Sequence, residues 1–429
     1  MQSLAILLAE RGHTVSGTDR NPTEESVRRL SSHGITVHRG HDREAARDCD
    51  VLVFSLAVPY DSPELVYARA CGIPCFSRAD ILGYLMAEYP IRVGVSGMHG
   101  KSTVTAMLSA ILVEDGKDPT VVSGAPLSLG GTPWRMGEGE IFLAEACEYR
   151  NSYLCLSPTL AVVLNAELEH TDFFHTEDEV RASFAAFMQG AETVVLPFAP
   201  TRVPLDPPQN AGIIRFGTEE EADVTAKNLS LADKKTSFDL YIQGKKYGRV
   251  ELELLGIHNV QNALAAAAAA YALGASPDAT VRALSGFCGA PMRLERKGEQ
   301  GGVLFFADYA HHPTEIRASL AALRQVSAAR GGRLFCLFQP HTYSRTASFF
   351  CDFINALSAA DRVILLDVYA AREQNESGVS SAALAASLSN ALYARDHAAA
   401  ISLLRAEIRE GDVAVVMGAG DIHAIFSRL

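Results

Sequence analysis

Along most of the chain, short apolar runs alternate with longer stretches in which apolar residues recur at helical spacing. Residues 91–95 form a short run rich in β-branched side chains, and an apolar stretch of helical character follows at 104–112. Runs of the first kind are typical of buried strands, and stretches of the second kind are typical of helices that cover a sheet. Their repeated alternation predicts parallel sheets flanked by helices, the α/β class.

The first 89 residues predict a small Rossmann-like α/β domain. The pattern gives helices over 2–11, 24–33, 43–47 and 63–70, and strands over 14–17, 35–38, 51–55 and 73–76. Asp19 follows the first of these strands, the place where dinucleotide-binding folds hold a ribose hydroxyl. Such folds normally begin with a strand and a glycine turn, whereas a helix comes first here. We therefore expect a truncated domain, with a naturally shorter sheet as the alternative.

A glycine turn joins the strand at 91–95 to the helix that follows it. Gly97 and Gly100 let the backbone turn tightly, so that several N–H groups and a helix N-terminus converge on one point. An anion fits such a point, and Lys101 adds a positive charge for its outer phosphates. The hydroxyl of Ser102 is the usual ligand of the accompanying Mg²⁺. The turn therefore predicts a nucleotide-binding site.

Two further strands of this region end in acidic residues. Glu145 closes an apolar run that begins at residue 141, and the run at 160–164 leads into a cluster that contains Glu167, Glu169 and His170. Strand ends at the carboxyl edge of a parallel sheet lie where ligands bind. These residue types suit a second Mg²⁺ or a catalytic base, and solvated loop charges are the alternative.

The segment that follows predicts an insertion and then a long helix. Residues 197–210 read as a loop, and 224–250 read as short antiparallel strands with a turn at Gly244. An alanine-rich helix then begins near Asn259 and Asn262, which share one face because they lie three residues apart. The two amides either cap the helix or present themselves to the edge of a base.

A third α/β unit follows the turn at 301–302. Its strands are expected at 303–306, 334–338, 362–368 and 413–417, and polar groups follow each of them. A single histidine in such a loop is usually structural. However, His311, His312 and His341 together with Arg345 all follow strand ends, which indicates a rim that closes over an anionic substrate.

Composition narrows the choice of function. The 38 basic and 50 acidic residues give a formal charge of −12, which argues against non-specific binding to nucleic acid or to an anionic membrane. Eight scattered cysteines lack the spacing of a zinc site, so reduced thiols in a cytoplasmic protein are expected. We find no signal peptide, and the apolar run at 263–275 is too short to span a bilayer.

The order of the motifs identifies a family resemblance. The motifs are Gly97-x-x-Gly100-Lys101-Ser102, Glu145-Ala146-x-Glu148, Asn165-x-x-x-x-His170, Gly256-x-His258-Asn259-x-x-Asn262, Asp308-Tyr309-Ala310-His311-His312-Pro313-Thr314-Glu315 and Gly418-Ala419-Gly420. Together they resemble the Mur ligases of bacterial cell-wall synthesis over essentially the whole chain. The resemblance implies a UDP-substrate domain at 1–89, a central P-loop ATPase domain at 90–296 and a C-terminal, Rossmann-like amino-acid domain at 297–429.

The resemblance also implies an activity, an ATP-dependent and Mg²⁺-dependent amide-forming reaction through an acyl phosphate. The stretch 338–346 resembles the members that take UDP-N-acetylmuramate and L-alanine as substrates. The implied catalytic residues are Lys101, Glu145, His170, His341 and Arg345, with Tyr343 beside them. Nucleotide contacts are implied for Gly97, Met98, His99, Gly100, Lys101, Ser102, Thr103, His258, Asn259, Asn262, Arg293 and Asp308, and metal contacts for Ser102, Glu145 and His170. Met98, where the family usually has Thr, and Met292, where it usually has Arg, depart from the pattern.

Two alternatives stay open at this stage. One is another Mur-type ligase, such as an enzyme that recycles a muramyl tripeptide or a folylpolyglutamate-like synthetase, although the stretch 338–346 argues against it. The other is a nucleotide-binding protein that is inactive through its truncated N-terminal domain. The sequence makes no prediction of oligomeric state.

Overall fold

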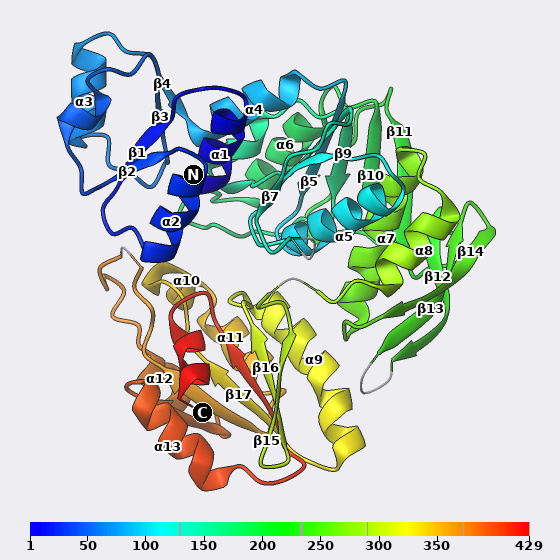
Figure 1. Ribbon diagram of the computed structural model, residues 1–429. Helices are drawn as coiled ribbons and strands as arrows, with labels where there is room; N and C mark the ends of the chain where they lie inside the picture. Colours follow the sequence, from blue (N-terminus) through cyan, green and yellow to red (C-terminus); the bar gives the residue numbers. More distant parts are fainter. Residues whose placement is uncertain (128–129, 232–234, 290, 372, 429) are drawn as a thin grey trace.

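The computed structural model describes residues 1–127, 130–231, 235–289, 291–371 and 373–428, and these form three parts that follow one another along the chain (Figure 1). The N-terminal part holds two small sheets, the central part a ten-stranded sheet and the C-terminal part a six-stranded sheet. In Figure 1 the C-terminal part, drawn from yellow to red, lies below the other two. Both large sheets carry helices on their faces, as the predicted α/β class requires.

The central sheet places the glycine turn at its middle. Its strands run in the order β14-β13-β12-β11-β10-β9-β5-β8-β6-β7, and those from β11 to β6 are parallel. The strands are β5 (Ile91–Ser96), β6 (Thr120–Val122), β7 (Trp134–Arg135), β8 (Ile141–Glu145), β9 (Leu160–Val163), β10 (Thr193–Pro197), β11 (Gly212–Gly217), β12 (Val224–Leu231), β13 (Thr236–Ile242) and β14 (Lys245–Leu252). Because β5 pairs with β8 and β9, the loops that follow these three strands meet at one edge.

Helices bury both faces of this sheet. They are α4 (Arg78–Ala87), α5 (Lys101–Glu114), η2 (Tyr149–Cys155), α6 (Glu177–Met188), α7 (Ile257–Ala272) and α8 (Pro277–Ser285). Eight consecutive residues of α7, Ala263–Ala270 with Leu264 among them, are inaccessible to solvent and belong to the same core cluster as Val104 and Leu108 of α5. Small side chains allow α7 to approach the sheet and α5 closely. The short antiparallel strands predicted over 224–250 are confirmed as β12, β13 and β14, with a turn at Gly244 between the last two.

The C-terminal sheet is parallel except at one edge. Its order is β15-β16-β20-β17-β18-β19, in which only β15 runs antiparallel to its neighbour. The elements are β15 (Glu295–Gln300), β16 (Val303–Asp308), α9 (Pro313–Arg330), β17 (Leu334–Phe338), α10 (Tyr343–Ser348), α11 (Phe350–Leu357), β18 (Arg362–Leu366), α12 (Ser381–Ala386), β19 (Ala391–Ala394), α13 (His397–Glu407), β20 (Val413–Met417) and η3 (Ile422–Ser427). The four predicted strands of this unit are confirmed, whereas β15 and β19 were not predicted because they are short or strongly polar.

The N-terminal part differs from the single doubly wound sheet that its pattern predicts. Its strands form two separate parallel pairs, β1 (Ser16–Asp19) with β2 (Thr36–Arg39) and β3 (Leu52–Phe54) with β4 (Cys75–Ser77). The accompanying helices are α1 (Gln2–Glu10), α2 (Glu24–Ser32), η1 (Arg43–Ala46) and α3 (Pro63–Ala70). Within the described residues no strand pairs with members of both sheets, so the pairs stay apart.

Two findings concern the described helices and the cysteines. Among the described residues, no helix combines the length and the apolar character needed to cross a membrane. All eight cysteines are free thiols, and most of them are at least partly accessible to solvent.

Candidate active site

The glycine turn between β5 and α5 forms the floor of the site. Gly100 caps α5 in a left-handed conformation with φ of 87°, and Gly97 has φ of 136°, so both positions require glycine. A Cβ on Gly100 would lie 2.6 Å from Oδ1 of Asn262, and one on Gly97 would lie 3.0 Å from Cβ of Leu164. The turn therefore exposes backbone N–H groups at the N-terminus of a 14-residue helix, an arrangement that attracts anions.

Lys101 returns from the first turn of α5 into this loop. Its Nζ donates to the carbonyl oxygens of Gly97 at 2.5 Å and Met98 at 3.1 Å, and it lies 2.9 Å from Oε2 of Glu148. Burial opposes the charge, but Glu148 outweighs it and raises the pKa of Lys101, so the ammonium stays protonated. The loop thus holds a fixed positive charge beside the helix N-terminus. Ser102 and Thr103 follow in the same turn, and both are buried.

Glu148 is the residue around which Lys101 and His170 meet. It is 1% exposed, and Nε2 of His170 lies 3.0 Å from its Oε1. Burial alone would raise the pKa of this carboxyl, yet the charge of Lys101 and the contact with His170 lower it to about 2. A buried carboxylate therefore stays ionised within reach of the phosphate loop. The sequence motif contained Glu148, but no role had been assigned to it.

Glu145 lies apart from this group. Its carboxylate accepts the backbone N–H of Gly124 at 2.7 Å and the hydroxyl of Ser123 at 3.5 Å, on the side toward β6. A Cβ on Gly124 would lie 2.6 Å from Oε1 of Glu145, so a larger residue there would displace this carboxylate. The structure thus joins His170 to Glu148 rather than to Glu145, and the metal role of Glu145 stays a prediction.

The residues predicted to meet the base lie at the start of α7. Asn259 is buried and donates to the carbonyl of Leu255 at 2.9 Å, while Asn262 donates to Oδ1 of Asn259 at 3.1 Å. Neither amide caps α7, which has no side-chain cap, and Asn262 lies against the phosphate loop at Gly100, so base recognition stays a prediction. The neighbouring His258 is desolvated by burial, which lowers its pKa to about 4 and keeps it neutral.

Asp308 ends β16 and points back into its own domain. Its Oδ1 accepts the N–H of Ala310 at 3.1 Å, and its Oδ2 accepts the hydroxyl of Ser319. Burial raises the pKa of this carboxyl to about 6, against the hydrogen bond from Ser319. Arg293 lies over the ring of Tyr309, 5.1 Å from its centroid. The ribose and phosphate roles of Asp308 and Arg293 stay predictions.

A second group of polar residues joins the central part to the C-terminal part. After β9 the chain presents alternate residues to the C-terminal part: Glu167 accepts from Thr314 at 3.1 Å and Glu169 from Arg345 at 3.3 Å. Thr171 continues the series with a contact to Ser348 at 3.3 Å. His170 between them has a positive φ of 54°, so the loop conformation rather than a regular strand directs these side chains to the C-terminal part.

His99, which belongs to the phosphate loop, also contacts residues of this junction. Its backbone N–H donates to Asn165 at 2.9 Å, while its ring contacts Glu167 through Nε2 and lies 3.2 Å from Glu315 through Nδ1. Burial would lower the pKa of His99, but the two carboxylates raise it to about 10. The ring also stacks on His312 at the start of α9, with 4.9 Å between centroids.

The residues predicted to line the amino-acid pocket lie at the same junction. Arg345, in α10, contacts Nδ1 of His341 at 3.4 Å as well as Glu169, and the side chains of Arg345 and Glu169 are 14% and 4% exposed. Burial and then the charge of Arg345 lower the pKa of His341, which favours a neutral imidazole. His311 lies near His341, with 6.0 Å between ring centroids, and Tyr343 begins α10. The structure therefore brings His311, His341 and Arg345 together, whereas His312 stacks on His99, and a rim that closes over an anionic substrate stays a prediction.

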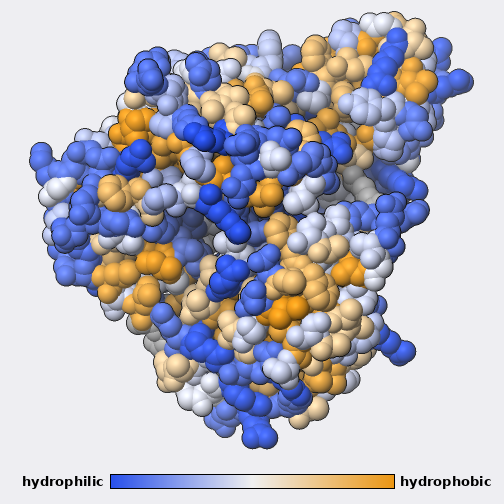
Figure 2. All heavy atoms as spheres, turned by 180° about the vertical axis from the view of Figure 1, so that it is seen from behind, coloured by the Kyte–Doolittle hydropathy of each residue, from blue (hydrophilic) through white to orange (hydrophobic). Residues whose placement is uncertain are grey.

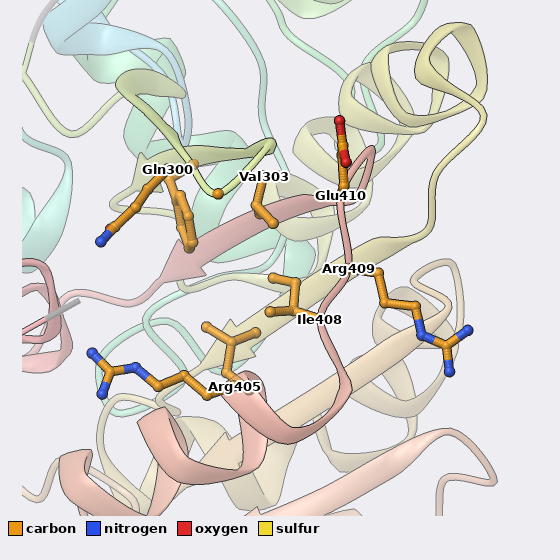
Figure 3. Close-up of a pocket in the computed structure, with 9 residues that line it drawn as sticks. Gln300, Val303, Arg405, Ile408, Arg409 and Glu410 are labelled. Carbon is orange, nitrogen blue, oxygen red and sulfur yellow. The ribbon is translucent and has the colours of Figure 1, made fainter.

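A pocket of about 390 Å³ lies elsewhere, at the amino ends of the C-terminal strands. It is bounded by Gln300, Val303 and Ile408, and in Figure 3 the guanidinium groups of Arg405 and Arg409 extend away from its centre. Ligands of parallel α/β sheets bind at the opposite, carboxyl edge, where His341 and Arg345 lie. This pocket therefore lies at the end of the sheet away from the candidate site.

Comparison with known families identifies the class of protein. A model described as "Mur ligase family, catalytic domain" matches residues 1–90, "Mur ligase middle domain" matches 95–270, and "Mur ligase, glutamate ligase domain" matches 292–420. The chain belongs to the Mur ligase family, as the motifs had indicated.

Individual relatives are similar over nearly the whole chain. The UDP-N-acetylmuramate–L-alanine ligase of Clostridium novyi is 36% identical over 433 residues, which cover 99% of this chain and 93% of that protein. The enzyme of the same name from Lachnoclostridium phytofermentans is 38% identical over 445 residues, covering 99% and 94%. The crystal structure of UDP-N-acetylmuramate–alanine ligase from Thermotoga maritima matches with a TM-score of 0.81 and 26% identity, covering 100% of this chain and 95% of that one.

Proposed function

We propose that this chain is an ATP-dependent ligase that joins L-alanine to the lactyl carboxylate of UDP-N-acetylmuramate, a step of peptidoglycan precursor synthesis. The relatives named above support the substrates of this proposal. The structural observation that supports it most strongly is the position of Lys101. Its ammonium lies in an anion-binding turn and is held by Glu148, 2.9 Å away, at the sheet edge that faces the C-terminal part.

The residues around the loop suit a nucleotide bound with a divalent cation. Glu148 stays ionised although it is buried, and the hydroxyl of Ser102 and the imidazole of His170 supply the other donor types. We assign the cation as Mg²⁺, held by Ser102, His170 and a carboxylate, either the predicted Glu145 or Glu148. Such an ion neutralises charge that develops on the phosphate oxygens.

In the first step of the reaction, the lactyl carboxylate attacks the γ-phosphorus of ATP, which forms an acyl phosphate and releases ADP. This transfer brings two anions together, so catalysis consists mainly of positioning and of positive charge held in place. Lys101 and the backbone N–H groups at the N-terminus of α5 hold the outer phosphates, while the N–H of His99 is bound by Asn165. Asn262 lies against this loop at Gly100 and helps to position the nucleotide.

In the second step, the amine of alanine attacks the acyl carbon and phosphate leaves as the amide forms. The amine must lose its proton before it attacks, and His341 is the neutral imidazole at the rim that accepts it. Arg345 binds the carboxylate of alanine, because a guanidinium presents two parallel N–H donors to a carboxylate. Glu169 holds Arg345 from the central part and so links the two halves of the site.

The test is phosphate release measured with ATP, Mg²⁺, UDP-N-acetylmuramate and one amine at a time. L-alanine, glycine, L-serine and the muramyl tripeptide are the amines and peptide to compare. Release with L-alanine supports the proposal, whereas release only with the tripeptide would establish the recycling alternative. An enzyme that binds ATP and releases no phosphate with any of them would be a nucleotide-binding protein without this activity.

A further inference from the structure

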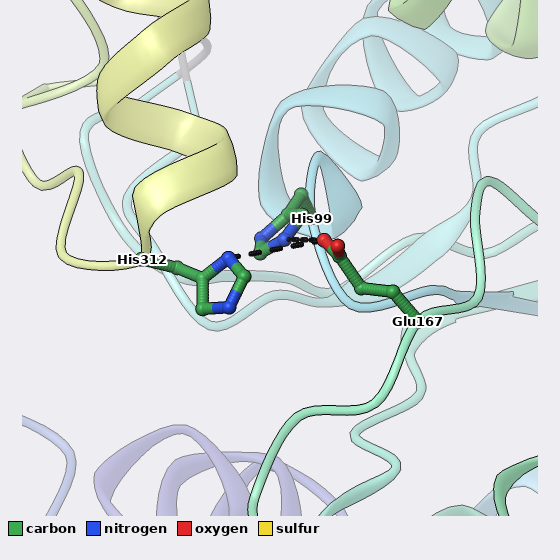
Figure 4. A group of neighbouring side chains, drawn as sticks. All are labelled: His99, Glu167 and His312. Carbon is green, nitrogen blue, oxygen red and sulfur yellow. Dashed lines mark hydrogen bonds and ion pairs between the residues drawn. The ribbon is translucent and has the colours of Figure 1, made fainter. Parts of the chain in front are cut away.

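Beside the proposed reaction centre, the side chains of His99, Glu167 and His312 point toward one another from three segments (Figure 4). His99 belongs to the phosphate loop, Glu167 follows β9, and His312 caps α9 of the C-terminal part. Nε2 of His99, Oε1 of Glu167 and Nδ1 of His312 all lie within 4.8 Å of one another. Their side chains are 14%, 9% and 3% exposed, so the cluster is largely shielded from solvent.

The surroundings of the cluster orient its three donor atoms. Glu315 lies 3.2 Å from Nδ1 of His99 and holds the proton on that nitrogen, so that Nε2 is the atom that would bind a metal after losing its own proton, as in carboxylate-supported metal-bound histidines. Thr314 donates its hydroxyl to Oε2 of Glu167 at 3.1 Å, which leaves Oε1 for the cluster. The backbone N–H of Thr314 donates to Nδ1 of His312 over 3.4 Å, so this nitrogen is unprotonated, and a bound metal would replace this long capping hydrogen bond.

This set of donors has the chemistry of a zinc site. Zn²⁺ favours two imidazoles and a carboxylate in a tetrahedral arrangement, with ligand atoms about 3.4 Å apart for bonds of about 2.1 Å. The three atoms are within an ångström or two of that spacing. Mg²⁺, in contrast, prefers an all-oxygen environment and retains its waters. The cluster is also distinct from the Mg²⁺ residues proposed above, since His170 contacts Glu148 and not Glu167.

We propose that His99, Glu167 and His312 form a binding site for a borderline divalent transition metal such as Zn²⁺, with water as the fourth ligand. The metal takes the place of the proton that His99 holds between its two carboxylates. Because the ligands come from the central and the C-terminal parts, the bound metal fastens the phosphate loop to the start of α9. This inference concerns metal binding alone and does not depend on the proposed reaction.

Calorimetric titration of ZnCl₂ into the full chain, with Mg²⁺ in excess and no nucleotide, tests the proposal. The wild type is expected to bind one Zn²⁺ at this site. His312→Ala and Glu167→Gln should each weaken that binding by about tenfold or more, since removing even a supporting contact costs about 10–100-fold. His397→Ala is the matched control, because it removes another C-terminal histidine that lies 3.5 Å from a carboxylate, and it should bind as the wild type does.

Two further readouts separate this site from other zinc ligands and from loss of structure. Thiolates are also Zn²⁺ ligands, and the chain has free cysteines, but a Co²⁺ complex of the cluster should show tetrahedral d–d bands without thiolate charge-transfer bands. Zn²⁺ binding to the wild type should release a proton, measured by repeating the titration in buffers of different ionisation enthalpy. Glu167→Gln preserves the side-chain shape and decides the matter if His312→Ala fails to fold. Absence of binding to the wild type, or equal binding by all variants, would overturn the proposal.

Discussion

Two buried carboxyl groups lie at the carboxyl ends of parallel strands: Asp308 is the last residue of β16, and Glu148 follows β8. Their pKa values are shifted in opposite directions. Glu148 contacts Lys101 and His170, and the pKa of its carboxyl is lowered to about 2. Asp308 accepts the N–H of Ala310 and the hydroxyl of Ser319, and the charge of Arg293 acts on it, yet burial raises its pKa to about 6. Burial is equally deep in the two cases, so the neighbouring cations make the difference.

The two sheet edges therefore differ in how well the charge of their buried carboxyl group is balanced. The central edge already contains its balancing charges, so it is organised before a nucleotide arrives. The C-terminal edge holds a carboxyl on which Arg293 acts through its charge, while the guanidinium lies over the ring of Tyr309. A ligand or a movement that brings a cation to Asp308 would make its ionised form more favourable. The hydrophilic side chains between the upper and lower halves of Figure 2 are consistent with a junction that stays polar.

Removing the cation from the central edge should have the largest effect. Lys101→Met keeps most of the side-chain volume but leaves Glu148 buried with His170 as its remaining partner. Loss of the charge on the phosphates should reduce kcat for phosphate release by about 10²–10³-fold. Breaking the buried pair should also lower the free energy of unfolding by about 3–5 kcal/mol. Steady-state phosphate release and thermal unfolding measure the two effects.

Lys117→Met is the control for this prediction. Lys117 lies outside the glycine turn and forms an ion pair with Asp115, with 3.4 Å between Nζ and Oδ2. Its activity should equal that of the wild type, and its stability should change little. Equal activity of the Lys101 and Lys117 variants would contradict the role given to the phosphate loop.

The next prediction distinguishes the two carboxylates that follow β8. Glu148→Gln removes the charge beside Lys101 and His170, whereas Glu145→Gln changes a side chain that accepts from the N–H of Gly124. We expect Glu148→Gln to raise the Mg²⁺ concentration needed for half-maximal rate by about 10–100-fold, and Glu145→Gln to raise it less. Mg²⁺ titration of the rate measures both. The reverse order would restore Glu145 as the metal ligand that the sequence predicts.

Periodicity was sufficient to predict most of the fold. Strands such as β17 (Leu334–Phe338) and β20 (Val413–Met417) were predicted at their observed bounds because their residues are apolar throughout and buried on both faces. In the N-terminal part the strands were located but their pairing was not, since strands of three or four residues with exposed positions contain little information on register. The edge strand β15 (Glu295–Gln300) was missed because it is polar and antiparallel.

The site was predictable where the chemistry is local. Lys101 and Ser102 follow a glycine turn in the sequence, so their position at a helix N-terminus could be inferred directly. The sequence could not decide between Glu145 and Glu148. Glu145 ends β8 and Glu148 lies three residues further on, and only the loop conformation determines which of them turns toward Lys101. Contacts between distant segments, such as Arg345 with Glu169, require the packing of the parts.

A smaller effect is expected from Arg345→Lys at the junction. The guanidinium reaches both His341, at 3.4 Å, and Glu169, at 3.3 Å, whereas an ammonium can contact only one of them well. We expect the KM for L-alanine to rise by about tenfold with a smaller fall in kcat, measured by titrating L-alanine in the phosphate-release assay. Arg324→Lys, which alters an ion pair with Asp361 in the same part, should leave KM unchanged. A change in kcat alone would contradict a role in binding alanine.

The smallest effect is a change in pH dependence at Asp308, and it tests the opening comparison directly. The pKa of Asp308 is about 6 in the folded chain against 3.8 for the unfolded one, because burial disfavours the charge. A raised pKa contributes stability that is fully present below the unfolded value and is lost as pH rises through the folded value. Wild type should therefore lose stability relative to Asp308→Asn between about pH 4 and about pH 6, by at most about 1.4 kcal/mol per pH unit. Urea unfolding of both proteins across that range measures the difference.

Asp361→Asn is the opposite control, because Arg324 and the N–H of Leu334 outweigh burial and lower the pKa of Asp361, so wild type should gain stability over that variant as pH rises. Parallel pH profiles for wild type and Asp308→Asn would show that Asp308 is as well compensated as Glu148, and the contrast between the two sheet edges would disappear.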